Sequence, residues 1–175
     1  MSTIAAKAVA SSLEGRVLAE AIRELGTTHV ISVPDTNLRS AIDVLAAWTK
    51  PNVMYVCTED EGIGINAGLY IAGHKPMLLI QNNGLYACLN TLKGIALDAQ
   101  VPTFLLIGQF GRDVTKTAQE NPKRMVHRLE PTLETWGVPY FRIDAPSEIG
   151  NLRRAWEAAW NSNGPSAAIV GAPTR

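Results

Sequence analysis

The sequence predicts an α/β domain: an open, mostly parallel six-stranded sheet with helices on both faces. Three observations support this fold class. Short apolar segments alternate with segments whose apolar residues recur at helical spacing. The expected strands are apolar throughout, which is typical of parallel strands that are covered on both faces. The length of 175 residues suits one domain with a sizeable core.

The expected strands are short and rich in branched or aromatic residues. They cover residues 29–33, 53–57, 76–80, 103–108, 140–143 and 166–171. The expected helices lie between them. They cover residues 13–26, 37–48, 60–73, 84–98, 129–137 and 147–160. The sequence contains no internal repeat and no low-complexity linker.

Local signals mark several boundaries of these elements. Gly26 is suited to stop the first helix, and Pro34 closes the first strand. Asp35 or Thr36 can cap the helix that follows. Residues 109–127 are polar and contain glycine and proline, which predicts a long loop.

Composition limits the classes of function. Hydrophobic residues make up 46% of the chain, charged residues only 18%, and the formal net charge is zero. Nothing in this balance suggests nucleic acid or an anionic membrane as a partner. Cys57 and Cys88 lie in apolar surroundings without metal-ligand spacing, as in a reduced protein. Residues 1–12 lack the apolar core of a signal peptide, and no apolar run could span a bilayer, so we expect a cytoplasmic protein.

Polar residues follow four of the expected strands. These segments read VPDT, CTEDEG, IQNNG and IGQFGRD. The carboxyl ends of parallel strands meet at one edge of the sheet, where open α/β sheets bind their ligands. We therefore expect the functional site at this edge.

The three acidic residues of CTEDEG admit more than one interpretation. Glu59, Asp60 and Glu61 fall in the first turn of an expected helix, where the helix dipole favours each by roughly 0.3–1 kcal/mol. A metal site or a carboxylate held for chemistry are the alternatives. His127 follows the long loop and could reach the same edge. No phosphate-binding loop, HxxEH motif or paired histidines are present in the sequence.

Five motifs occur in the order and spacing of one known family. They are SVPDTNL, TEDEGIGINAGLYIAGHKP, MLLIQNNGL followed by LNTL, VPTFLLIG and HRLEPTLETWGVPY. From about residue 13 to its end, the chain resembles the sulfopyruvate and phosphonopyruvate decarboxylases. These are thiamine diphosphate-dependent 2-oxo acid decarboxylases. The resemblance implies that residues 1–175 form a single pyrimidine-binding domain.

The resemblance separates Glu59 from its acidic neighbours. The family's catalytic glutamate precedes an Ala-Gly pair by eight and nine residues, and Ala67 and Gly68 lie at that distance from Glu59. In the family this carboxyl group shares a proton with the aminopyrimidine ring of the cofactor and thereby activates it. Asp60 and Glu61 keep the helix-start explanation.

Other positions follow from the same resemblance. Asp35 matches an acidic residue on the first loop that faces the substrate and could relay protons. Gln81, Asn82 and Asn83 match a QNSG motif next to cofactor and substrate, with Asn83 in place of the serine.

The segment GQFG departs from the family pattern. Phe110 stands where the sulfonate and phosphonate enzymes have an arginine, which argues for an aromatic or aliphatic 2-oxo acid as substrate. Thr36, Phe110, Arg112 and His127 are the expected substrate-binding residues.

The sequence contains no GDG motif, the motif that introduces the family's magnesium and diphosphate site. The resemblance therefore implies thiamine diphosphate and Mg2+ as cofactors, with metal ligands on a separate beta subunit in an alpha2beta2 or larger assembly. The expected reaction releases carbon dioxide from a 2-oxo acid and leaves an aldehyde. Two alternatives stay open: a carboligase subunit of the acetolactate synthase type, and a non-catalytic regulatory subunit.

Overall fold

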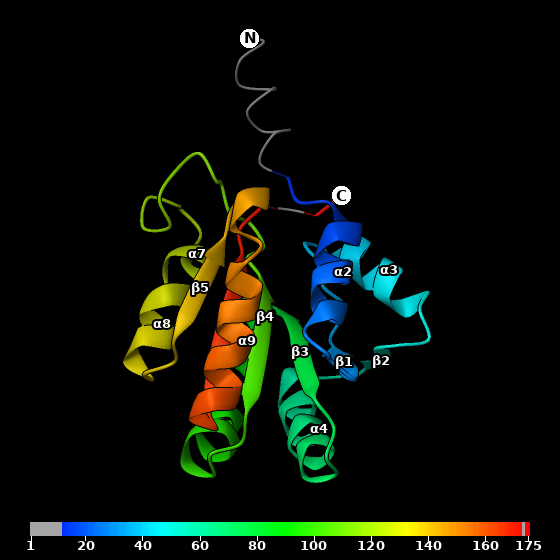
Figure 1. Ribbon diagram of the computed structural model, residues 1–175. Helices are drawn as coiled ribbons and strands as arrows, with labels where there is room; N and C mark the ends of the chain where they lie inside the picture. The colour runs from blue at the N-terminus through cyan, green and yellow to red at the C-terminus, as the bar shows by residue number, and fades with distance from the viewer. Residues whose placement is uncertain (1–11, 173) are drawn as a thin grey trace.

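The computed structural model describes residues 12–172, 174 and 175. Six parallel strands form one open sheet in the order β2-β1-β3-β4-β6-β5 (Figure 1). They are β1 His29–Ser32, β2 Asn52–Tyr55, β3 Pro76–Gln81, β4 Thr103–Gly108, β5 Tyr140–Ile143 and β6 Pro165–Val170. The predicted fold class is confirmed, and the sheet is parallel throughout.

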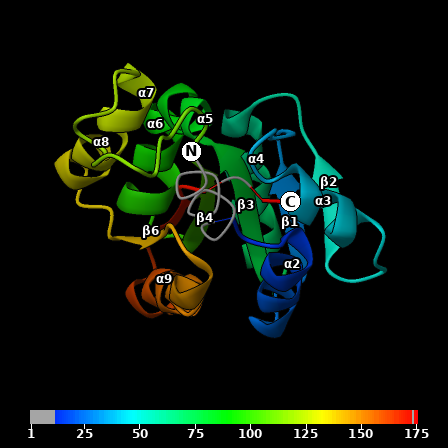
Figure 2. The same cartoon turned by 90° about the horizontal axis from the view of Figure 1, so that it is seen from above.

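Helices cover both faces of the sheet (Figure 2). One face carries α2 Gly15–Glu24, α3 Arg39–Ala46 and α9 Asn151–Ser162. The other face carries α4 Glu59–Ile71, α5 Asn82–Ala87, α6 Leu89–Thr91, the π-helical segment η1 Leu92–Asp98, α7 Arg124–His127 and α8 Leu129–Thr135. A short 3-10 turn, η2 Pro146–Glu148, precedes α9.

Each central strand supplies both cores because successive side chains of a strand point to opposite faces. In β3, Met77 and Leu79 pack with the α2, α3 and α9 side, whereas Leu78 and Ile80 pack with the opposite side. All four are buried. This two-sided burial explains why the strands are apolar throughout and do not alternate with polar residues.

The helix predicted over residues 84–98 is wrong in its boundaries. It begins at Asn82, directly after β3, and divides at Cys88 into α5, α6 and the π-helical segment. Cys88 has φ −106° and ψ 11°, outside the regular helical range, which ends α5 there. The helix predicted from residue 147 is also wrong in its start, because it begins four residues later, at Asn151.

The long loop predicted over residues 109–127 ends earlier than expected. Its last four residues form α7, where the carbonyl of Lys123 accepts hydrogen bonds from the amides of Val126 and His127. The segment before it is held by its own side chains. For example, the Asn121 side chain donates to the carbonyls of Asp113 and Thr117.

The predicted cap of α3 is wrong, and neither α3 nor α5 has a side-chain cap. Asp35 accepts a hydrogen bond from the amide of Asn37, but α3 begins only at Arg39 and has no side-chain cap. Thr36 does not cap it either. The side chain of Asn82 accepts from its neighbour Asn83, so α5 also lacks a side-chain cap. Both acceptors are short side chains that bond to adjacent backbone in a turn.

The start of α4 agrees with the helix-start interpretation. Thr58 caps the helix by accepting a hydrogen bond from the amide of Glu61. Glu61 accepts in return from the amide of Cys57, at 2.9 Å. Asp60 accepts from the hydroxyl of Thr91 at 2.9 Å and so joins α4 to α6. Glu59 takes no part in this capping.

Both edge strands are short. β2 and β5, at the two edges of the sheet, have four residues each. In the described part of the chain, no helix is long and apolar enough to cross a membrane.

Candidate functional site

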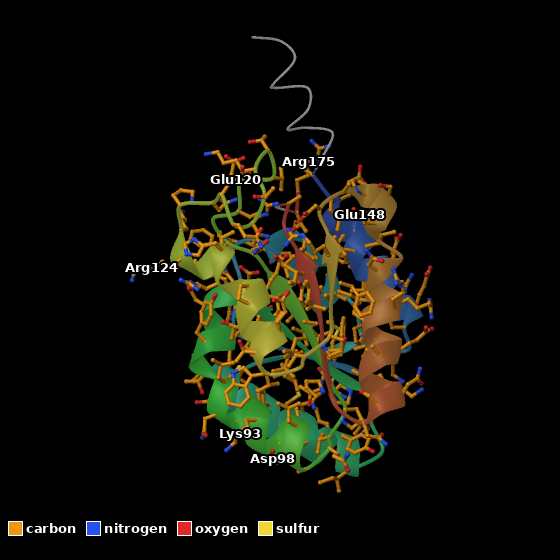
Figure 3. The ribbon with its side chains drawn as sticks, turned by 90° about the vertical axis from the view of Figure 1, so that its left-hand side faces the viewer. Lys93, Asp98, Glu120, Arg124, Glu148 and Arg175 are labelled. Atoms are coloured by element: carbon orange, nitrogen blue, oxygen red, sulfur yellow. The ribbon has the colours of Figure 1, made fainter. Side chains whose placement is uncertain are left out.

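The candidate site lies at the carboxyl edge of the sheet, where the strand order reverses. From β1 the chain passes to β2 on one side, and β3 pairs with β1 on the other. The connections after β1 and β3 therefore diverge and leave space between them. In Figure 3, Glu120 and Glu148, which follow β4 and β5, mark this end of the molecule, and Lys93 and Asp98 mark the opposite end.

Asp35, three residues beyond β1, is 2% exposed. Its Oδ1 accepts hydrogen bonds from the amide of Asn37 at 2.8 Å and from Nε2 of Gln81 at 3.1 Å. Its Oδ2 is buried without a hydrogen-bond partner in the described structure, and a Cβ atom added to Gly108 would overlap it. Only glycine at the end of β4 leaves room for this carboxyl group.

Burial raises the pKa of Asp35, and the hydrogen bonds from Asn37 and Gln81 oppose that rise. A carboxyl group in this environment retains a proton at a higher pH than an exposed aspartate does. One oxygen is held by two donors while the other remains free. The arrangement suits a group that gives and takes a proton.

Glu59 is the first residue of α4 and follows β2. Its side chain lies against the backbone of α5, where a Cβ atom added to Gly84 would overlap the carboxyl group. Among the described residues, the Glu59 side chain makes no hydrogen bond and no ion pair. The partly buried carboxylate is thus positioned by packing and leaves both oxygens for a ligand.

Gln81 links the segments that follow β1 and β3. Its side chain donates to Asp35 and accepts from Nδ2 of Asn83 at 3.2 Å. Asn82 has a different role, because its Nδ2 donates to the carbonyls of Phe110 and Met125, at 3.2 and 3.1 Å. Gln81 and Asn83 therefore face the edge, whereas Asn82 holds the segment that follows β4.

Thr36 and Phe110 lie at the surface of the same edge. Thr36 is exposed and, with Asp35, lines a cavity of about 260 Å3 that also includes Arg39 and Tyr55. Phe110 is 38% exposed, and the ammonium group of Lys123 lies 5.2 Å from the centre of its ring.

Arg112 and His127 are turned into the loop. The Arg112 side chain is 5% exposed, donates to the carbonyls of Asp113 and Lys116, and lies 3.8 Å from the carboxylate of Asp144. Burial lowers the pKa of Arg112, and the nearby guanidinium of Arg142 lowers it further. Nδ1 of His127 lies 2.9 Å from the carbonyl of Asn121. The structure does not bring these two side chains together with Glu59 and Asp35.

Sequence reasoning missed a network of charged residues beside the site. Arg142, in β5, binds Asp144 at 2.8 Å, Glu130 of α8 and the side chain of Gln109 at 3.3 Å. The nearby carboxylates of Asp144 and Glu130 raise the pKa of Arg142 against the effect of burial. The available signal was a charged residue inside the apolar strand YFRI.

No family model matches this chain. It is 31% identical over 154 residues to the sulfopyruvate decarboxylase subunit alpha of Methanococcus maripaludis, covering 87% of this chain and 91% of that protein. The chain belongs to the sulfopyruvate decarboxylase alpha-subunit family.

Two further relatives have lower identity. The sulfopyruvate decarboxylase subunit alpha of Methanocaldococcus jannaschii is 27% identical over 132 residues, which cover 75% of this chain and 77% of that protein. The protein named sulfopyruvate decarboxylase of Methanosarcina acetivorans is 27% identical over 151 residues. The match covers 86% of this chain but only 38% of that longer protein.

The carboxyl edge of this alpha-subunit family member presents acceptor oxygens whose chemistry fits a protonated ring nitrogen. Glu59 offers two free oxygens, Asp35 offers an orphaned buried oxygen, and Gly84 and Gly108 make space at both. These groups are acceptors and proton carriers and are not cations that would hold a diphosphate. Among the described residues, no cluster of three or more His, Cys, Asp or Glu side chains could hold a metal ion.

Proposed function

We propose that this chain is the pyrimidine-binding subunit of a two-component, thiamine diphosphate-dependent decarboxylase. The enzyme would release carbon dioxide from a 2-oxo acid and leave an aldehyde. The family supports a decarboxylase subunit, because the relatives bear the name of one. The dependence on thiamine diphosphate and the roles of individual residues are our proposal.

The observation that carries the proposal is the state of the Glu59 carboxyl group. It follows a strand at the ligand-binding edge, it is positioned by Gly84, and it makes no hydrogen bond or ion pair with any described residue. A partly buried carboxylate that lacks a hydrogen-bond partner raises the free energy of the protein until a ligand supplies that partner. A ring nitrogen that shares a proton with Glu59 would supply it.

When bound, thiamine diphosphate supplies a nucleophilic carbon and an electron sink for the departure of carbon dioxide. The role of this chain is to hold the aminopyrimidine and to manage protons. Glu59 would hold a proton against the ring nitrogen, and the glycine at position 84 would fix the position of the carboxyl group. The apolar side of α5 and Cys88 beneath it would limit the access of water.

Asp35 would move a proton on the substrate side. Its raised pKa favours the protonated form, and Gln81 holds one of its oxygens in place. A carboxyl group with a raised pKa can donate its proton to a carbanion-like product and recover it from water. Asn83 orients Gln81 and acts as a positioning residue.

A partner subunit would complete the site. The relatives are named subunit alpha, and a subunit implies an assembly. The helix α4 that begins with Glu59 leaves Gly64 and Gly68 open and exposes 81% of Ile71. An apolar helix face of this kind is suited to close packing against another chain. The partner would bring the magnesium ion and the diphosphate site.

The substrate class is the part of the proposal that departs from the relatives' names. Phe110 presents an exposed ring where an oxyanion-binding arginine is expected, and Arg112 is folded into the loop. We therefore favour an aliphatic or aromatic 2-oxo acid over sulfopyruvate. Lys123, next to the Phe110 ring, is the cation through which sulfopyruvate could still be recognised. Comparing kcat/KM for sulfopyruvate and phenylpyruvate decides between the two.

The decisive experiment compares two acids of the same helix turn. With the beta subunit, thiamine diphosphate and Mg2+ present, Glu59→Gln should abolish the release of carbon dioxide from the 2-oxo acid. Glu61→Gln is the matched control and should retain activity, because Glu61 serves the helix cap. An active Glu59→Gln enzyme would remove the basis of the proposal.

The same assay separates the alternative reactions. A free aldehyde among the products identifies a decarboxylase, and a hydroxyketone with a new carbon–carbon bond identifies a carboligase. A regulatory subunit would change the rate of the beta subunit without any dependence on Glu59.

A further inference from the structure

A second cavity lies at the opposite edge of the sheet from Glu59. It has a volume of about 450 Å3 and is bounded by the starts of β1 and β2 and by the turns after α2, α3 and α4. This volume is within the range of small-molecule sites. The cavity contains no residue of the proposed catalytic site.

Four cationic or titratable side chains line this cavity, and each comes from a different part of the fold. Arg23 comes from α2, His29 from β1, Lys50 from the turn before β2, and His74 from the turn before β3. No aspartate or glutamate is among the lining residues. No acidic side chain of the cavity lining therefore neutralises these four basic groups.

None of the four forms an ion pair within the described structure. The guanidinium of Arg23 stacks over the ring of Trp48, 4.4 Å from its centre. The rings of His29 and His74 meet edge to face with centroids 4.7 Å apart. Nδ1 of His29 lies 3.0 Å from the hydroxyl of Thr28, which leaves its Nε2 without a hydrogen-bond partner among the described residues.

The surroundings of His29 disfavour its charged form. Burial lowers the pKa of His29, and the charge of His74 lowers it further. Like-charged groups held this close become easier to protonate when an anion lies between them. The helices α2, α3 and α4 all end near this edge, and their dipoles favour cations there by only about 0.3–1 kcal/mol each. Those dipoles explain cations near the edge, but they do not explain a cavity whose ionisable lining residues are all basic.

We propose that this cavity binds a small organic oxyanion, a carboxylate with a compact planar body. The carboxylate would lie between Lys50 and the two histidines. The planar body would lie against Pro51 and the imidazole rings. This inference is independent of the proposed function, because it uses no residue of the carboxyl edge.

Histidine NMR on the full chain provides the test. The sequence contains three histidines, and the third, His127, lies on α7, outside the cavity. With 13C-labelled histidine in this chain, purified in its native assembly, benzoate should shift the ring resonances of His29 and His74 and leave those of His127 unchanged. Benzamide, which has the same shape without the charge, should leave all three unchanged.

Two lysine variants make the test specific. Lys50→Met should weaken benzoate binding by at least about tenfold, the loss expected when a hydrogen bond to a charged group is removed. Lys93→Met is the control, since Lys93 lies at the same end of the molecule but outside the cavity (Figure 3), and it should bind benzoate normally.

Two results would overturn the inference. One is the absence of a benzoate-dependent shift at His29 and His74. The other is an equal shift at all three histidines, which would indicate a general effect of ionic strength. Neither result depends on whether the enzyme decarboxylates a 2-oxo acid, so failure here and failure of the proposed function are separable.

Discussion

The carboxyl edge of the sheet has two halves that treat their carboxylates differently. On the β1–β3 half, Asp35 and Glu59 have no cationic partner among the described residues. On the β4–β5 half, Asp144 and Glu130 are both bound by Arg142. Asp144 directly follows β5, and Glu130 lies in α8. The difference separates two carboxylates that an arginine holds from two that no cation among the described residues holds.

Glycine does not distinguish the two halves, but arginine does. A Cβ atom would overlap Glu59 at Gly84 and Asp35 at Gly108, and it would equally overlap Asp144 at Gly171. At this edge, each of these three carboxyl groups therefore lies directly against the backbone of a glycine. The guanidinium of Arg142 is the partner that Asp144 has and that Glu59 and Asp35 lack among the described residues.

Loss of the arginine should have the largest effect on stability. Arg142→Met leaves the carboxylates of Glu130 and Asp144 partly buried without their cation. We expect the free energy of unfolding to fall by about 2–3 kcal/mol, near the lower end for a broken buried ion pair because these groups keep some contact with water. Urea denaturation measures it. Unchanged stability would show that the two halves do not differ as described.

Gly84→Ala should give the next largest effect and should act on catalysis. The new methyl group must displace the Glu59 carboxyl group, and a misplacement of about 1 Å can cost about a hundredfold in rate. The measurement is kcat for carbon dioxide release by the reconstituted enzyme. Gly94→Ala is the matched control, because a Cβ atom there meets nothing within 4 Å. If both variants kept full activity, Glu59 would not need its present position.

Asp35→Asn should separate stability from activity. The native pKa of Asp35 is raised, so between its ordinary value and the raised value the native state binds more protons than the unfolded state. The free energy of unfolding contributed by this group therefore falls as pH increases through that range and stays lower above it. Asparagine removes this loss.

We accordingly expect Asp35→Asn to be more stable than the native chain at neutral pH by about 1 kcal/mol, while its activity drops. Urea denaturation at about pH 4 and about pH 7 measures the change, and the difference between the two proteins should shrink at the lower pH. A variant that loses stability at neutral pH would contradict the unpaired state of Oδ2.

The smallest effect is expected at an exposed pair near the same edge. Arg39 and Asp43 lie 3.8 Å apart with most of both side chains in water. Arg39→Met should change the free energy of unfolding by less than about 0.5 kcal/mol, the usual value for a surface pair. The same denaturation assay calibrates the Arg142 result. A loss as large as that of Arg142→Met would mean that burial does not govern these ion pairs.

The strands and their positions along the chain could be predicted because the signals for them are local. Apolar runs, Gly26 and Pro34 each act on neighbouring backbone. The position of Glu59 could be predicted for a similar reason, since a residue directly after a parallel strand must lie at the carboxyl edge. Its assignment among three acids came from the family resemblance, and the structure agrees that its two neighbours serve the helix start and α6.

The remaining features depend on contacts between distant segments. Arg142 meets Glu130 and Gln109 across 12 and 33 positions of sequence, and β6 lies between β4 and β5, an order that no local pattern reveals. The amide of Asn82 donates to the carbonyls of Phe110 and Met125, which lie 28 and 43 positions further along the chain. The side chain of Arg112 donates to the carbonyl of Lys116 within its own loop.

The two short edge strands have a consequence for assembly. β2 and β5 end after four residues, which leaves little unpaired backbone to template a further strand. Continuous sheets across subunits are therefore disfavoured, and so is strand-mediated aggregation of the isolated chain. Helix faces and the two ends of the sheet are the surfaces left for an association, and the carboxyl edge where Glu59 is open is one of them.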